Sequence, residues 1–179
     1  FDTNKICIGG AWRSPDSADL LPIQDPSSGE TFGQIARGTA PDIDAAVASA
    51  RSALASDWGR MTATQRGRIL TRIAQLVLDR TDDLAWMEAR DVGKPLTQAR
   101  NDVIALARYM EFYGGAADKL HGTTIPYLDG YTVYTLREPH GVTGHIVPWN
   151  YPMQIIGRSV GAARAMGNAC VLKTAEAAR

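Results

Sequence analysis

The sequence predicts an α/β fold in which helices cover a parallel sheet, and three observations lead to this prediction. A β-branched run at 142–147, a helical pattern at 152–166 and a short apolar run at 169–172 have the order strand, helix, strand. Helical periodicity dominates residues 41–117, which would supply the cover for the sheet. Residues 123–137 have the pattern of two strands around a turn, which predicts a protruding β-hairpin.

The composition is that of an ordinary globular domain. The chain has 179 residues, a formal net charge of +0 and 45% hydrophobic residues, enough for a hydrophobic core. The balanced charge does not favour binding to nucleic acid or to an anionic membrane surface. No apolar run has the length of a membrane span, and residues 1–5 lack the basic and apolar regions of a signal peptide, so we expect a cytoplasmic protein.

The cysteines and histidines predict neither a disulfide nor a metal site. Cys7 and Cys170 lie far apart in apolar, strand-like surroundings, so we expect both to be buried free thiols. His121, His140 and His145 lack the spacing of zinc ligands. We therefore expect no bound metal.

Residues 1–40 are rich in turn-forming residues and predict an N-terminal arm of short strands. Strand candidates at 5–8, 20–24 and 31–36 are separated by turns that contain glycine or proline. The arm precedes the first helical pattern.

Four helices are predicted, beginning at Pro41, Thr62, Thr81 and Leu96 and ending near residue 117. Asp42 and Asp44 favour the positive end of the first helix dipole, and Gly93 ends the third helix. The aromatic residues of this region have no spacing typical of a stacking platform, so we expect them in the core: Trp58, Trp86, Tyr109 and Phe112.

The second helix has the clearest sequence signals. Thr62 and Gln65, three positions apart, predict a capping box at its start. Its expected core-facing stripe consists of Ile69, Ile73, Leu76 and Val77. Its arginines are interpreted as a solvent-exposed face rather than a binding patch: Arg66, Arg68, Arg72 and Arg80.

The candidate catalytic side chain lies in the loop Pro148-Trp149-Asn150-Tyr151-Pro152, between the first strand and the helix of the βαβ unit. Ligands of open α/β sheets bind beyond the carboxyl ends of strands, so Asn150 is well placed for chemistry. Taken alone, an asparagine beside prolines is more often a turn residue bonded to its own backbone. Lys173 and Glu176 follow the second strand at the same edge, although such residues in loops are usually solvent-exposed and uninvolved.

These motifs resemble the N-terminal half of the NAD(P)-dependent aldehyde dehydrogenase superfamily. The resemblance rests on Pro148-Trp149-Asn150-Tyr151-Pro152 and on the segment 167–176, in which Lys173 follows Asn150 at the family's separation of 23 positions (173 − 150). Weaker similarities occur at residues 25–30, 93–95, 117–122 and 137–139, so the resemblance covers essentially the whole chain.

The resemblance implies the N-terminal portion of a Rossmann-like fold. Residues 1–122 and 139–179 would form a partial NAD-binding domain, residues 123–138 an oligomerisation hairpin, and the catalytic domain would lie outside this chain. The activity implied is oxidation of an aldehyde to a carboxylic acid with NAD(P)+ through a cysteine thiohemiacetal. The family's nucleophilic cysteine and glutamate base lie downstream of the matched region, so we expect the chain alone to be inactive. A homo-oligomer, either a dimer or a tetramer, would form through the hairpin.

The resemblance also implies roles for single residues. Asn150 would stabilise the oxyanion, and Lys173 and Glu176 would bind the hydroxyls of the adenosine ribose. A carboxylate at this position repels a 2′-phosphate, which favours NAD although NADP remains open. The cofactor groove would be lined by Ile146, Val147, Pro148 and Trp149.

Tyr151 and Arg158 are the candidate substrate residues. They lie seven positions apart, two turns along one side of the predicted helix, where the resembled enzymes often build an aldehyde tunnel. An arginine there could bind the carboxylate of an acidic semialdehyde, and the alternative is an ordinary surface arginine.

Three hypotheses of different classes follow. The chain is part of a full-length aldehyde dehydrogenase, a short nucleotide-binding protein without catalysis, or an assembly module that uses the hairpin. We rank them in that order.

Overall fold

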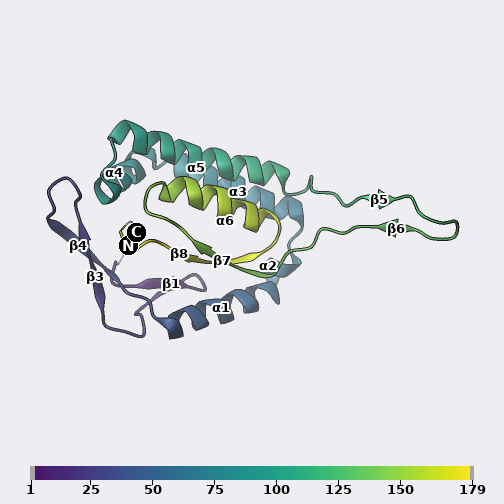
Figure 1. Cartoon of the computed structure of the whole chain (residues 1–179), viewed down its shortest axis with the longest axis horizontal. Helices are drawn as coiled ribbons and strands as arrows, with labels where there is room; N and C mark the ends of the chain where they lie inside the picture. Colours follow the sequence, from purple (N-terminus) through teal and green to yellow (C-terminus); the bar gives the residue numbers. More distant parts are fainter. Residues whose placement is uncertain (1–2, 178–179) are drawn as a thin grey trace.

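The computed structural model describes residues 3–177, and Figure 1 shows the arrangement of its elements. The strands are β1 (Ile6–Ile8), β2 (Ala11–Arg13), β3 (Leu20–Gln24), β4 (Thr31–Ala36), β5 (Thr124–Ile125), β6 (Val133–Tyr134), β7 (Val142–Ile146) and β8 (Ala169–Lys173). The helices are α1 (Ala40–Leu54), α2 (Asp57–Arg60), α3 (Ala63–Leu78), α4 (Thr81–Val92), α5 (Leu96–Ala116) and α6 (Pro152–Ala165). The sequence patterns predict all of these except the short β2 and α2.

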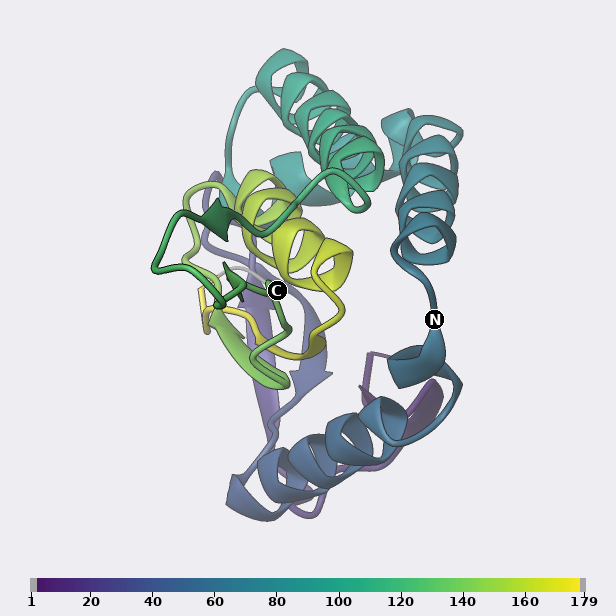
Figure 2. The same ribbon diagram turned by 90° about the vertical axis from the view of Figure 1, so that its right-hand side faces the viewer.

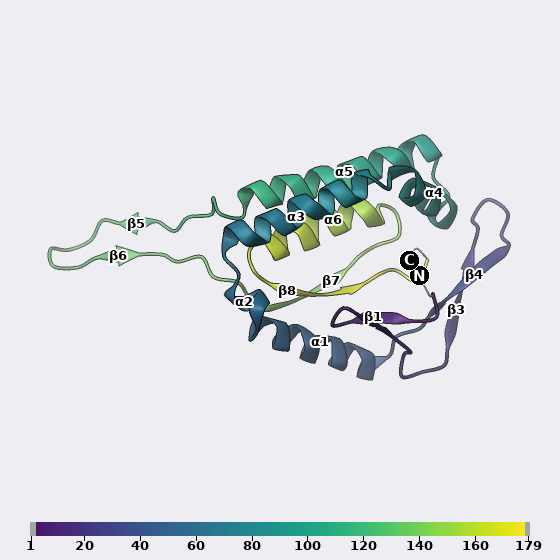
Figure 3. The same cartoon turned by 180° about the vertical axis from the view of Figure 1, so that it is seen from behind.

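The parallel pair β7–β8, connected by α6, lies at the centre of the molecule and confirms the predicted βαβ unit. Val142 pairs with Ala169, and the register continues to Ile146 and Lys173. In Figures 1 and 3, α6 covers one face of the pair and α1 covers the other. Both faces are therefore packed, as is usual for parallel strands.

Helices α3, α5 and α6 pack together on one side of β7–β8, with α1 on the other side (Figure 2). Their shared core consists of Leu70, Ala74, Leu106, Ala107, Met110, Ala117 and Ala165. Alanine dominates this set, and Gly157 of α6 is also buried, so the helices approach closely. A second cluster, formed by Ala85, Ala99 and Val103, packs α4 against α5.

The buried face of α3 differs from the predicted stripe. Three members of that stripe are exposed: Ile69, Ile73 and Leu76. Leu70 and Ala74 are buried instead, at 2% and 1% exposure. The apolar period fits both neighbouring faces of the helix, and only the face that carries Gly67 allows the backbone of α3 to approach that of α5. Tertiary contact, rather than hydrophobicity, therefore selects the face.

Arg66 is not part of a solvent-exposed arginine face, which corrects the interpretation made from the sequence. Its side chain donates from Nη1 to the Met61 carbonyl at 2.6 Å and from Nε to the Ala165 carbonyl at 3.2 Å. Burial lowers the pKa of Arg66. This arginine thus connects the start of α3 to the end of α6, whereas Arg68 and Arg72 are exposed as expected.

Two expectations of burial are also wrong. Trp86 and Phe112 are 60% and 67% exposed, because they lie on the outer sides of α4 and α5, while Trp58 and Tyr109 are half-buried. Cys7 is exposed, because the alternation along β1 turns Ile6 and Ile8 inward and Cys7 outward. Cys7 and Cys170 are both free, and Cys170 is half-buried.

The β5–β6 hairpin projects far from the helical layer (Figure 1). The strands are antiparallel, with Thr124 opposite Tyr134 and Ile125 opposite Val133. Gly130, with φ +83°, allows the turn between them. The predicted hairpin is therefore confirmed, with a shorter paired segment than the sequence pattern indicates.

Candidate functional site

The strands β7 and β8 end at the same edge of the sheet. Ile146 is the register partner of Lys173, and the N–H of Val147 donates to the Lys173 carbonyl at 2.9 Å. The loop that contains Asn150 and the turn that contains Glu176 both start from this edge. Segments 23 positions apart in the sequence (173 − 150) are thereby brought to one end of the βαβ unit.

Most residues expected to line a cofactor groove are open to solvent at this edge. Ile146 is 81% exposed and Trp149 is 57% exposed, and Pro148 is exposed as well. Val147 differs, because its side chain is 1% exposed and belongs to the core. As a whole residue Val147 is thus closed to solvent, and its N–H is already bonded to the Lys173 carbonyl. Asn150 is exposed.

The polar pair expected at the ribose lies just beyond β8. Lys173 and Glu176 are both exposed, and the Lys173 ammonium donates to the neighbouring Thr174 carbonyl at 2.9 Å. The pair has the donor and acceptor chemistry that a diol requires.

The two candidate substrate residues lie at the N-terminus of α6 and within it. Tyr151 is the N-cap residue of α6 and is half-buried, and its hydroxyl accepts a hydrogen bond from Gln98 Nε2 at 3.0 Å. Arg158 is exposed in the helix that Tyr151 precedes.

A buried cluster of charges lies directly behind the Asn150 loop. The Lys94 ammonium donates to Glu88 Oε1 at 2.8 Å, to Asp102 Oδ2 at 2.5 Å and to the backbone carbonyl of Asn150 at 3.2 Å. The side chains of Lys94, Glu88 and Asp102 are only 7%, 1% and 3% exposed. The cluster therefore connects the end of α4, the start of α5 and the loop after β7.

Two further contacts connect this cluster to α6. Gln154 Nε2 donates to the second oxygen of Asp102 at 2.7 Å, and Lys94 Nζ lies 4.7 Å from the centre of the Tyr151 ring. The loop and the first turn of α6 are thus held to α4 and α5 through one ammonium and its carboxylates.

The charges within the cluster shift one another's ionisation. Burial raises the pKa of Glu88, and the hydrogen bond and charge of Lys94 only partly oppose this. Burial alone would lower the pKa of Lys94, but the hydrogen bonds to Asp102 and Glu88 and the charges of both outweigh it, so the pKa is raised. The ammonium form of Lys94 is therefore favoured.

Sequence reasoning missed the Lys94 cluster, although a signal was present. Glu88 lies three positions after Ala85, and Asp102 lies three positions after Ala99, so each carboxylate shares the buried face of its helix. A carboxylate on an apolar helix face requires a buried partner. The sequence does not reveal that the partner of both is Lys94.

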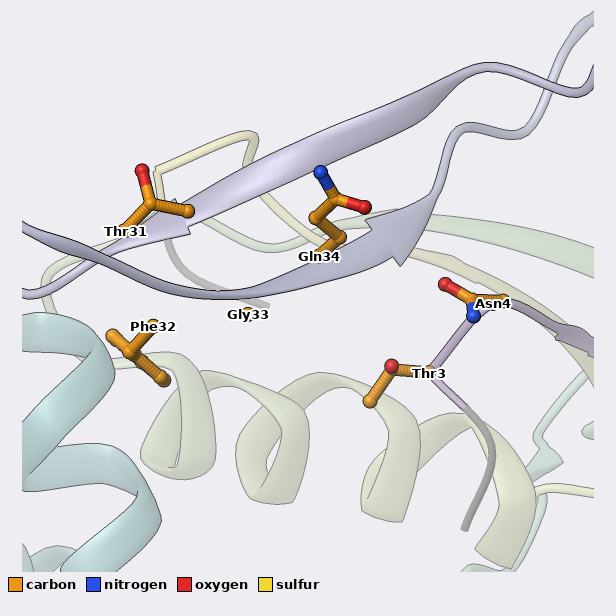
Figure 4. A pocket seen from close by; sticks show the side chains of 6 residues that line it. All are labelled: Thr3, Asn4, Thr31, Phe32, Gly33 and Gln34. Carbon is orange, nitrogen blue, oxygen red and sulfur yellow. The ribbon is translucent and has the colours of Figure 1, made fainter.

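A separate hollow lies on the N-terminal arm (Figure 4). It is open, with a volume of about 400 Å³, and is lined by Thr3, Asn4, Thr31, Phe32, Gly33 and Gln34. None of these side chains is an acid, a base or a strong nucleophile, so we assign it no chemistry.

Residues 3–177 contain neither the pattern of a metal site nor that of a membrane-spanning helix. Within this range no three or more His, Cys, Asp or Glu side chains are grouped so that they could hold a metal ion. None of the helices in the same range is both long and apolar enough to cross a bilayer.

Comparison with known proteins places this geometry in a family. Residues 12–179 match the aldehyde dehydrogenase family. The mitochondrial benzaldehyde dehydrogenase of Antirrhinum majus is 44% identical over 175 residues, which cover 97% of this chain and 33% of that protein. A crystal structure from Burkholderia cenocepacia, provisionally assigned as an aldehyde dehydrogenase, superposes with a TM-score of 0.94 at 64% identity, over 96% of this chain and 36% of that one.

A solved structure with a bound ligand is also similar. PnpE in complex with nicotinamide adenine dinucleotide superposes with a TM-score of 0.92 at 33% identity, over 97% of this chain and 36% of that one. The present chain thus spans about a third of the length of the relatives that it matches. From this agreement in sequence and fold, the chain belongs to the aldehyde dehydrogenase family.

Proposed function

We propose that this chain is the N-terminal, cofactor-binding part of an NAD-dependent aldehyde dehydrogenase, which oxidises an aldehyde to a carboxylic acid. The observation that carries the proposal is the common edge of β7 and β8. Ile146 lies opposite Lys173, so the Asn150 loop and the Lys173–Glu176 segment leave the sheet together. Such an edge is where dinucleotides bind in open α/β sheets.

NAD fits the residues at this edge. The Lys173 ammonium can donate to the ribose hydroxyls and the Glu176 carboxylate can accept from them, and both are exposed. The exposed side chains of Ile146 and Trp149 offer apolar surface beside them. When bound, NAD supplies the hydride acceptor of the reaction. The negative charge of Glu176 disfavours a 2′-phosphate, so we propose NAD rather than NADP.

Asn150 would act on the substrate carbonyl. Its carboxamide carries no net charge, so it can donate a hydrogen bond to a developing oxyanion without fixing the ionisation of a nearby thiol. Removal of one such donor lowers kcat by about 100-fold to 1000-fold in other enzymes. The nucleophile itself would come from a part of the enzyme outside this chain.

The test is turnover by the full-length enzyme. Asn150→Ala should lower kcat by about 100-fold while the dissociation constant of NAD changes less than about twofold, because the carboxamide acts on the oxyanion. As the matched control, Asn101→Ala removes an exposed asparagine of α5 and should leave both values unchanged. A wild-type kcat in Asn150→Ala would exclude the proposed role.

The substrate would carry a carboxylate in addition to its aldehyde group if Arg158 lines the aldehyde path. Arg158 is exposed on α6, two turns after Tyr151, and its guanidinium can bind a carboxylate bidentately. Arg158→Ala should then raise KM for succinic semialdehyde more than for a neutral aliphatic aldehyde. Equal effects on the two substrates would make Arg158 an ordinary surface residue.

The competing functions make different predictions for the isolated chain. We expect residues 1–179 alone to form no reduced cofactor from NAD and an aldehyde, since the family's nucleophile and base lie outside them. NAD binding in calorimetry by an intact short protein, without any turnover, would favour the nucleotide-binding module. Assembly independent of cofactor would favour the oligomerisation module at residues 123–138. Residues 1–122 and 139–179 are the proposed partial NAD-binding domain.

A further inference from the structure

The Asn150 loop is held from behind by a charge that nothing in its own sequence provides. Lys94 donates to the backbone carbonyl of Asn150 at 3.2 Å, although the two residues are 56 positions apart. Glu88 and Asp102 hold the same ammonium at 2.8 and 2.5 Å. All three N–H donors of the ammonium are therefore in use.

The contact with Lys94 acts on the backbone of the loop, from which the Asn150 side chain projects. The Asn150 side chain is part of an exposed residue, whereas its carbonyl is bound to an ammonium that is itself 7% exposed. Rotation of the peptide at Asn150 would break this bond and leave Lys94 hydrogen-bonded to the two carboxylates alone. The direction of the carboxamide is thus coupled to a buried anchor.

The neighbouring contacts oppose movement of the same segment. Tyr151 lies against Lys94 through its ring and accepts from Gln98 through its hydroxyl. Gln154 donates to Asp102 at 2.7 Å, which holds the first turn of α6. Loop and helix start are therefore fixed together by α4, by α5 and by the turn between them.

We propose that Lys94, held by Glu88 and Asp102, is a positioning residue that sets the direction of the Asn150 carboxamide. This inference rests on the proposed function of Asn150. It concerns orientation alone: Lys94 does not reach the substrate, and its contact is with the backbone of the residue that does. A small misplacement of a catalytic group can lower a rate about 100-fold.

The test is a double-mutant cycle in the full-length enzyme. Lys94→Met should lower kcat by about 10-fold to 100-fold, with the dissociation constant of NAD changed less than about twofold. In an Asn150→Ala background the same substitution should change kcat less than about twofold, because the group that Lys94 positions is already absent. A merely structural lysine would instead lower kcat by the same factor in both backgrounds.

Two controls separate positioning from stability. Arg66→Met removes another half-buried cation that donates to backbone carbonyls, at the far end of α6, and should leave kcat unchanged. Lys94→Met leaves two buried carboxylates without their cation, so Lys94→Met/Glu88→Gln is measured beside it to relieve one of the charges. Both Lys94 variants should show the same loss of kcat. Glu88→Gln alone should retain most of the wild-type kcat.

The outcomes distinguish this inference from the proposed function. If Asn150→Ala lowers kcat while Lys94→Met and the double variant do not, only the positioning role is wrong. If the losses from Lys94→Met and Asn150→Ala multiply, the positioning role is wrong as well. If Asn150→Ala leaves kcat unchanged, the proposed role of Asn150 fails and the role of Lys94 fails with it.

Discussion

At the scale of single residues, the buried carboxylate of Asp42 fixes the start of α1. Asp42 is 3% exposed, and one oxygen accepts from the Thr39 N–H and hydroxyl at 2.9 and 3.0 Å. The N–H of Asp16 donates to both oxygens at 3.1 and 3.2 Å. The hydrogen bond from the Thr39 N–H, supported by that from Asp16, holds the pKa of Asp42 below its ordinary value of 3.8 in spite of burial.

Asp42→Asn should therefore lower stability at neutral pH and change its acid dependence. A group whose pKa is lower in the folded protein stabilises the fold above its unfolded pKa, and this contribution is lost as the pH falls through the folded pKa. We expect a loss of about 1–3 kcal/mol at pH 7, which shrinks below about pH 4, from urea unfolding across this range. As a control, Asp44→Asn, exposed in the same helix, should change stability by less than about 0.5 kcal/mol. Parallel acid profiles for wild type and Asp42→Asn would contradict the prediction.

Of the two capping boxes, the sequence predicts the one at α3 but not the one at α1. Thr62 and Gln65 have the familiar residue types, and the structure confirms the predicted box at α3. Thr39 and Asp42 form the equivalent box at α1, where the sequence suggests only a dipole interaction for Asp42. An aspartate at the third position also reaches Asp16, a contact across 26 positions that no local pattern contains.

At the scale of elements, α3 and α5 meet through a pair of glycines. A Cβ on Gly67 would lie 2.4 Å from the Gly114 carbonyl oxygen, and one on Gly114 would lie 2.9 Å from the Gly67 carbonyl oxygen. Both contacts are with backbone, which can move only if the whole helix shifts. The helices thus approach at a distance that any side chain would prevent.

Gly67→Ala should destabilise the protein even though alanine is the better helix former. Alanine gains about 1 kcal/mol over glycine inside a helix, while overpacking costs about 1–3 kcal/mol, so we expect a net loss in the urea unfolding free energy. Gly115 is the matched control, because it lies in α5 with nothing within 4 Å of an added Cβ. Gly115→Ala should be neutral or stabilising by up to about 1 kcal/mol. A stabilised Gly67→Ala variant would show that the helices separate without cost.

The sequence predicts the features of the elements that are local, and it does not predict those that depend on the contact between α3 and α5. Strands β3 and β4 have the predicted bounds, and Gly93, with φ +78°, ends α4 as expected, because turns and caps are local. The buried face of α3 is not local, since it depends on the close approach at Gly67. Hydrophobicity alone favours Ile69 and Ile73, which are exposed.

At the scale of the whole molecule, the order of strands and helices along the chain predicts the candidate site. It does not predict the Lys94 cluster that holds the Asn150 loop. Because consecutive parallel strands end at one edge of the sheet, the sequence alone predicts that Asn150 and Lys173 lie at the same edge. Lys94 enters from the turn between α4 and α5, and its partners come from both helices. Only the packing of α4 and α5 beside α6 brings these charges behind the Asn150 loop.

The β5–β6 hairpin is the feature of the whole molecule that most needs a partner. Each strand contributes two paired residues, and an isolated two-stranded hairpin is marginally stable in water. Five of its large apolar side chains are 62–70% exposed: Tyr127, Leu128, Tyr131, Tyr134 and Leu136. We propose that a second copy of the chain covers this projecting apolar ribbon.

Tyr134→Ser/Leu136→Ser should therefore reduce the number of subunits in the full-length protein. The measurement is the molar mass from light scattering coupled to size-exclusion chromatography. The two substitutions remove apolar contact surface while they leave the backbone of the short hairpin able to pair. Trp86→Ser is the matched control, because Trp86 is 60% exposed on α4, away from the hairpin, and its loss should leave the mass unchanged. An unchanged mass in the hairpin variant, or an equal decrease in both, would assign assembly to another surface.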